Sequence, residues 1–184
     1  MIEDFFRLLI DALIYYPYQV IPSTVSAPIF SAALTALTLQ QEAPLTATLH
    51  YLRDILSYGT LNPSNSAFES ENRQTSTNPP EIQATVKQLV LSQGEVLIQR
   101  ILTGMMFSFP RDCFPDASGV LLVLFELMPQ DVAVWVRGTV GMLPTGTVKP
   151  GEADRLMNGI SDKVQKGEIR KVRTLLQGKL RHSL

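Results

Sequence analysis

The sequence contains very few of the residues that build covalent cross-links or metal sites. Its 184 residues include one cysteine, Cys113, and two histidines, His50 and His182. A disulfide framework needs paired cysteines, and a zinc site made of Cys and His alone needs more ligands than these. The composition therefore excludes both kinds of site and is typical of a protein from a reducing compartment.

Long apolar runs and the common catalytic motifs are also missing. The longest runs, 29–39 and 120–127, are shorter than the roughly 20 residues that span a bilayer. The acidic, amphipathic start lacks the basic region and cleavage site of a secretory signal. The chain has no P-loop, no GxGxxG after a strand, no HExxH and no nucleophile elbow. We therefore expect a soluble protein that is not an enzyme, with no catalytic, metal or cofactor site and no membrane partner.

Charge is distributed unevenly along the chain. The net charge is −1, but residues 163–184 hold seven Lys or Arg and one Glu. These residues carry +6, so residues 1–162 carry −7. An acidic body with a basic end can steer charged partners over about 8 to 10 Å at physiological salt.

Apolar residues recur at helical spacing along most of the chain, and β-branched alternation is scarce. Ser26 and Asp116 are expected to be N-caps, since their side chains can accept hydrogen bonds from the first turn. In the first helix one apolar stripe is expected to contain Phe5, Phe6, Leu9, Ala12, Leu13 and Tyr16. Helices are predicted over residues 2–16, 26–40, 44–58, 81–107, 116–128, 130–143, 152–166 and 168–182.

Two segments stand apart from this helical pattern within a single predicted domain, 1–184. Residues 60–80 are rich in Asn, Ser, Thr and Pro and have almost no apolar residues, so we expect a flexible loop there. The helix at 168–182 has one apolar stripe and a basic outer face, which suits a capping helix. That face includes the candidate basic surface Arg170, Lys171 and Arg173.

The predicted helices form antiparallel pairs, with 2–16 joined to 26–40, 44–58 to 81–107, and 116–128 to 130–143. The first helices of the first two pairs start about 42 residues apart, within the roughly 40–47-residue period of HEAT repeats. A helix pair cannot bury its apolar face alone, so stacked pairs share a core and present long binding surfaces. The sequence therefore predicts an all-α superhelix of the HEAT/ARM type with about four helix pairs.

Three residues allow a functional and a structural interpretation. His50 has Asp54 four residues on, as in a general-base pair, although a surface or satisfied histidine is favoured. Cys113 has a neighbouring Arg and a following helix N-terminus that would lower its pKa, although a buried structural thiol is favoured. Trp135 is a possible cargo anchor, although its helical spacing with Val132 favours a core position.

Charged residues offer two candidate interaction surfaces. Carboxylates on second helices are candidates to contact a basic cargo, with ordinary solvated acids as the alternative; they are Glu81, Glu95 and Asp131. The basic terminal helix is a candidate for binding phosphates or RNA. It has no stacking aromatic residues, so a solvated capping face is favoured and no direct contact with nucleic acid is expected.

Several segments together resemble a known family. They are Asp-Phe-Phe at 4–6, Leu-Arg-Asp-Ile-Leu at 52–56 before Gly59, the stretch 99–115 with its Phe and Pro residues, and Val-Trp-Val at 134–136 before 143–144. In order and spacing they resemble the C-terminal region of a karyopherin-β nuclear import receptor. The branch is that of transportin-SR and importin-13, in a fungal-type form. The likeness runs through nearly the whole chain.

The resemblance implies a receptor that shuttles between cytoplasm and nucleus with RNA-binding cargo rich in Arg/Ser or Arg/Gly segments. Cargo release on binding Ran-GTP, and contact with nucleoporins, would be properties of the full-length receptor. The family's Ran-binding surface and arginine-rich cargo helix lie upstream of the matching region, so neither is assigned to residues here. The alternatives are a general α-solenoid scaffold or adaptor, and an RNA-binding module that uses the basic tail.

Overall fold

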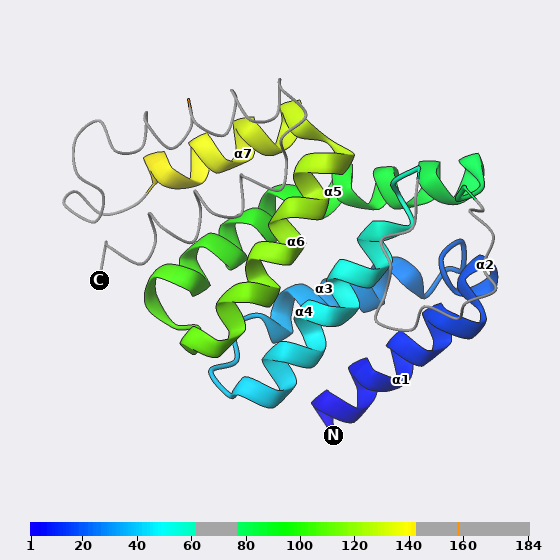
Figure 1. Ribbon diagram of the computed structural model, residues 1–184, viewed down its shortest axis with the longest axis horizontal. Coiled ribbons are helices and arrows are strands. Elements are labelled where there is room, and N and C mark those ends of the chain that lie inside the picture. The colour runs from blue at the N-terminus through cyan, green and yellow to red at the C-terminus, as the bar shows by residue number, and fades with distance from the viewer. Residues whose placement is uncertain (62–76, 143–157, 159–184) are drawn as a thin grey trace.

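The computed structural model describes residues 1–61, 77–142 and 158 (Figure 1). The elements are α1 (Ile2–Tyr15), α2 (Pro17–Val20), α3 (Ser26–Ala36), α4 (Glu42–Ser57), α5 (Pro80–Phe107), the 3-10 helix η1 (Arg111–Cys113), α6 (Phe114–Leu127) and α7 (Pro129–Gly141). No strand occurs in these ranges. The predicted all-α fold is confirmed.

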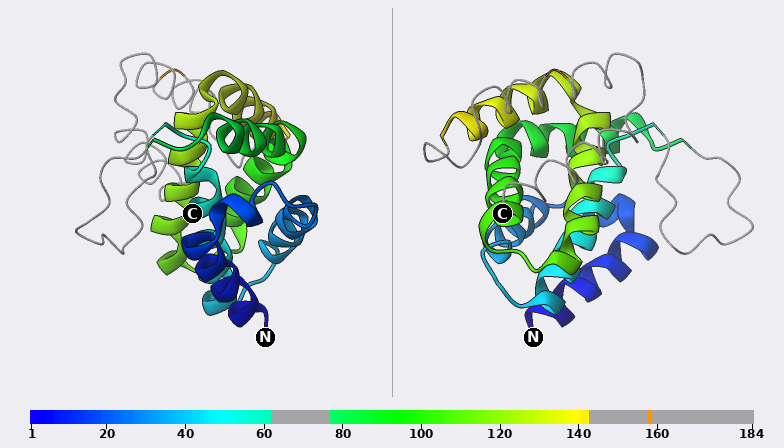
Figure 2. Two further views of the ribbon diagram at one scale, coloured as in Figure 1. Left: turned by 90° about the vertical axis from the view of Figure 1, so that its right-hand side faces the viewer. Right: turned by 60° about the vertical axis from the view of Figure 1, so that its left-hand side comes forward.

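The helices lie in two layers. In the A layer, which we define as α1, α4, η1 and α6, helix α4 packs against α1 on one side and α6 on the other (Figure 1). In the B layer, defined as α3, α5 and α7, helix α5 contacts both α3 and α7. In the view turned by 90° (Figure 2, left), α1 and α6 lie on one side of the molecule and α3 and α5 on the other. This arrangement is that of stacked first and second helices in an α–α superhelix.

Contacts between the layers join successive pairs as well as the members of one pair. Helix α6 packs on α7, as predicted. The other two predicted pairings are wrong as main contacts, because α3 packs on α4 and α5 instead of on α1, and α5 packs on α6 and α7 instead of on α4. Each second helix therefore touches the first helix of the following pair. The core is shared along the stack, as expected where one pair has too little apolar area to fold alone.

Helix α4 lies at the centre of the core and is covered on almost every side. Its residues Leu45, Leu49, Tyr51, Leu52, Ile55 and Leu56 are each at most 1% exposed. The ring of Tyr51 lies 5.5 Å from that of Phe6, and the hydroxyl of Tyr58 donates a hydrogen bond of 2.9 Å to the carbonyl of Leu13. These two contacts stabilise the packing of α1 against α4.

The predicted apolar stripe of the first helix divides between two faces. Phe6 and Leu13 are 2% and 1% exposed and face the core, whereas Phe5 and Tyr16 are 44% and 62% exposed. Helical spacing alone groups these residues together. Among the described helices α1 packs mainly on α4, so only residues close to that contact line are covered.

Two predicted N-caps are wrong. Helix α6 begins at Phe114 instead of Asp116, and the residue before it makes no side-chain capping bond. Pro115 falls in the first turn. A backbone N–H there would have no acceptor within the helix, so proline, which lacks this N–H, costs no hydrogen bond. Ser26 is the first residue of α3, and its buried hydroxyl has no hydrogen-bond partner among the described residues. Proline in the first turn thus replaces side-chain capping in α6.

Glycine allows the close approach of two B-layer helices. A Cβ atom built on Gly94 of α5 would lie 2.6 Å from Cζ3 of Trp135 in α7. Trp135 is partly buried and packs against the hydrophobic core. The structure thus supports the core interpretation of Trp135, and the absence of a side chain at Gly94 makes room for its ring.

Asn78 joins the two described ends of the predicted loop 60–80. Its side-chain amide donates hydrogen bonds to the carbonyl oxygens of Ser57 and Thr60, at 3.2 and 2.9 Å. Its backbone N–H donates a hydrogen bond of 3.2 Å to the carbonyl oxygen of Leu61. Thr60 and Asn78 are buried. Both ends of the predicted loop are therefore ordered, and the middle of the loop, 62–76, lies outside the described residues. The predicted helices 152–166 and 168–182 lie outside them as well, apart from residue 158.

Candidate protein-binding surfaces

The three predicted cargo carboxylates lie on the B layer. Glu81 is exposed in the first turn of α5, and Glu95 is exposed on the same side fourteen residues later, about 21 Å along the helix axis. Asp131 is half-buried in the first turn of α7. The B-layer helices carry an equal number of cations, Lys87, Arg100 and Arg137. The B layer has no excess negative charge, and cargo contact at these carboxylates stays a prediction.

The negative charge of the described residues is concentrated on the A layer. Its helices contain three Arg and eight acidic residues, a net charge of −5. The acids are Glu3, Asp4, Asp11, Glu42, Asp54, Asp112, Asp116 and Glu126. The sequence predicts that residues 1–162 are acidic, but not that the negative charge gathers on one layer. The reason is that alternate helices along the chain belong to different layers.

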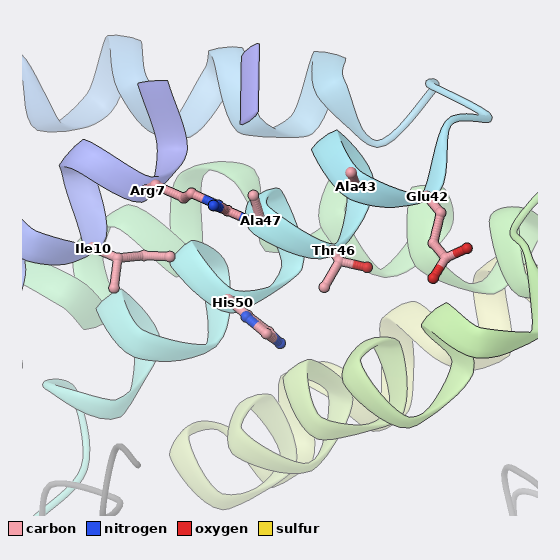
Figure 3. Close-up of a pocket in the computed structure, with 7 residues that line it drawn as sticks. All are labelled: Arg7, Ile10, Glu42, Ala43, Thr46, Ala47 and His50. Atoms are coloured by element: carbon pink, nitrogen blue, oxygen red, sulfur yellow. The ribbon is translucent and has the colours of Figure 1, made fainter. Parts of the chain in front are cut away.

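A groove of about 470 Å³ runs between α1 and α4 on the A layer (Figure 3). Small apolar side chains, Ala43 and Ala47, and the stem of Ile10 line it. Arg7, Glu42, Thr46 and His50 provide its polar groups, and Arg7 is paired with Glu3 at 2.6 Å. The groove can accommodate a partner side chain. Sequence reasoning did not find it because its two walls are far apart in the chain.

His50 is satisfied by a residue of another helix. Its Nε2 atom lies 3.0 Å from Oδ1 of Asp116 in α6, and Arg53 approaches the same carboxylate at 4.0 Å. Asp54, the predicted partner, instead meets Nε of Arg53 at 3.5 Å. Burial raises the pKa of Asp54, and the charge of Arg53 partly opposes this shift. The structure supports a satisfied histidine that ties α4 to α6.

Cys113 is fully buried at the start of α6. Its Sγ atom lies 3.5 Å from Oγ1 of Thr46 in α4. Burial raises the pKa of this thiol, in part offset by Thr46. The alternative of a lowered pKa is therefore wrong, because lost solvation outweighs the nearby helix N-terminus.

Residues 1–61 and 77–142 contain no group of three His, Cys, Asp or Glu side chains arranged to hold a metal ion. No helix within these ranges has the length and apolar character needed to cross a membrane. The candidate basic surface, Arg170, Lys171 and Arg173, lies outside the described residues.

Two yeast proteins are similar to this chain along nearly all of it. The uncharacterized protein C11G11.07 of Schizosaccharomyces pombe is 30% identical over 181 residues, which cover 96% of this chain and 18% of that protein. The mRNA transport regulator MTR10 of Saccharomyces cerevisiae is 27% identical over 182 residues, which cover 94% and 18%. No family model matches the chain. The chain thus spans 18% of the length of each of these relatives, and resembles a segment of a longer protein named for mRNA transport.

Proposed function

We propose that this chain is a structural and cargo-binding segment of a karyopherin-β nuclear import receptor of the transportin-SR and importin-13 branch. The observation that carries the proposal is its similarity, over 94% of its length, to an mRNA transport regulator. The two-layered helical stack supports it, because such stacks offer long surfaces to protein partners. In this role the segment binds protein and catalyses no reaction.

The cargo of the complete receptor would be RNA-binding proteins with Arg/Ser-rich or Arg/Gly-rich segments. The receptor would move between cytoplasm and nucleus, and Ran-GTP and nucleoporins would act on the full-length molecule. A cationic cargo segment is attracted most strongly where negative charge is in excess. In this chain two faces compete for it: the B layer with Glu81 and Glu95, and the more acidic A layer.

A titration of the chain with an Arg/Ser-rich RNA-binding protein and with a nonspecific RNA, at two salt concentrations, tests the proposal. Saturable binding of the protein, with no binding of the RNA, is the expected result. A scaffold would show no preference for basic RNA-binding proteins over neutral ones, and this result would contradict cargo binding by the segment.

An RNA-binding module would give a different pattern in the same titration. Its affinity for RNA would fall steeply with salt, since each neutralised phosphate releases counterions. The double substitution Lys171→Glu and Arg173→Glu would then abolish RNA binding. If the proposed function is right, neither the parent chain nor this double variant binds RNA.

A further inference from the structure

The groove between α1 and α4 has an apolar floor. Ala43 and Ala47, four residues apart on α4, form this floor, and Ile10 and Arg7 reach toward it from α1 (Figure 3). The charge of Arg7 is compensated by its ion pair with Glu3. Because alanine leaves most of the space above it open, the groove of about 470 Å³ has room for the aliphatic stem of a long side chain. Such a stem is stabilised by covering apolar surface while its polar end stays in water.

A polar rim borders this floor on the other side. Glu42, Thr46 and His50 follow one another at intervals of four residues and therefore lie on one face of α4. His50 is already paired with Asp116. Glu42 is exposed and forms no ion pair within the described part of the chain. Its carboxylate is therefore the charge of the groove that is available to a partner.

Negative charge is in excess around the end of the groove at which Glu42 lies. The hydroxyl of Thr46 in the rim is 3.5 Å from the thiol of Cys113. Burial raises the pKa of this thiol, and three nearby carboxylates raise it further. They are Glu42 of α4, Asp112 of η1 and Asp116 of α6. Three segments thus bring carboxylates to one end of the groove, and this arrangement attracts a cation.

We propose that the groove receives an arginine of a basic peptide segment. The stem of this arginine lies on Ala43 and Ala47, and its guanidinium pairs with the carboxylate of Glu42. Arginine fits better than lysine, because a guanidinium is less strongly hydrated and can bind a carboxylate through two hydrogen bonds. The inference rests on the proposed function, in which the cargo carries such segments. It adds the place where the segment binds and the residue type that is recognised.

Titration of the chain with two peptides of equal charge tests the proposal. One peptide alternates Gly with Arg and the other alternates Gly with Lys, and calorimetry at low salt measures both affinities. The expected result is saturable binding, with the Arg peptide bound about three- to tenfold more tightly. Equal affinities would overturn the proposal, because general attraction to the acidic A layer does not distinguish the two cations.

Two substitutions in α4 locate the site. Glu42→Gln should weaken binding of the Arg peptide by about three- to fivefold, as for an exposed charge pair. Ala43→Leu should weaken it by about tenfold, because the longer side chain occupies the floor. The matched controls on the B layer are Glu81→Gln, also in a first helical turn, and Ala84→Leu, also at an exposed position. Both controls should leave the affinity unchanged. Circular dichroism and Tm of all four variants should match those of the parent chain.

Other outcomes would contradict the proposal. If neither α4 substitution changes the affinity, the peptide binds elsewhere. If a peptide with Phe in place of Arg binds as tightly, the groove takes an apolar side chain instead.

The same variants separate this proposal from the proposed function. A cargo protein that binds the chain equally well with and without Ala43→Leu would support the proposed function and overturn the groove as the cargo site. Arg-specific peptide binding that depends on Ala43 and Glu42, without binding of the cargo protein, would support the groove and contradict the proposed function.

Discussion

The two layers of the stack differ in charge and in how their helices are held together. The A layer carries a net charge of −5 and ties α4 to its neighbours through polar contacts, among them His50 with Asp116 and Tyr58 with Leu13. The B layer is neutral and brings α5 and α7 together at a glycine, Gly94. The difference indicates that a cationic partner is attracted more strongly to the A layer, whereas the packing of α5 on α7 depends on the absence of a side chain at position 94.

Removing apolar volume from the middle of the A layer should have the largest effect. Leu52 in α4 is fully buried, so Leu52→Ala should lower the free energy of unfolding by about 2 to 5 kcal/mol through a cavity. The matched change Leu8→Ala on α1 should cost less than about 0.5 kcal/mol, because Leu8 is 66% exposed. Urea denaturation measures both. Equal losses would contradict the description of α4 as central and of α1 as covered on one face only.

Adding volume to the B layer should have the next largest effect. Gly94→Val should destabilise the chain by about 1 to 3 kcal/mol, because its side chain would overlap the ring of Trp135 and force α5 from α7. Thermal unfolding together with Trp fluorescence measures the change. Gly138→Val is the control, since a Cβ there meets no atom within 4 Å. If both substitutions lowered Tm alike, helix propensity and not packing would explain the loss.

Charge reversal on each layer should then separate the two cargo faces. Glu42→Lys with Asp112→Lys on the A layer changes the net charge as much as Glu81→Lys with Glu95→Lys on the B layer. If cargo is attracted mainly by the A layer, the first pair should weaken binding of an Arg/Ser-rich protein by roughly two- to fivefold more than the second. The reverse order would place the cargo on the B layer. Equal losses would show that only net charge matters.

The smallest expected effect concerns a half-buried carboxylate of the A layer, Asp54. Because burial raises the pKa of Asp54 above the ordinary value of 3.8, the folded chain holds this proton at higher pH than the unfolded chain does. The contribution of Asp54 to stability therefore declines as pH rises through the window just above 3.8. Asp54→Asn should flatten this part of the stability–pH curve and gain about 0.5 kcal/mol or less at pH 7. An unchanged slope in urea titrations from pH 3 to 7 would contradict this assignment.

Helix positions were predictable where a local pattern was strong. The long helix predicted at 81–107 is found at Pro80–Phe107, because its apolar period is unbroken and prolines stand at its start. The predicted caps Ser26 and Asp116 were wrong, since capping depends on where a turn closes and not only on residue type. The A-layer groove and the pairing of His50 with Asp116 were not predictable, because their parts come from helices that are distant in the chain.

Local chemistry dictated that this chain is helical, where most helices lie, and that its body is acidic, because these properties depend on neighbouring residues within a few turns. Packing decided which half of each apolar stripe is buried, as Phe5 and Phe6 show on adjacent positions of α1. Packing also placed all the excess negative charge of the described residues on one layer. The physical reason is that burial and charge proximity are properties of neighbours in space, and folding brings residues from α1, α4 and α6 together.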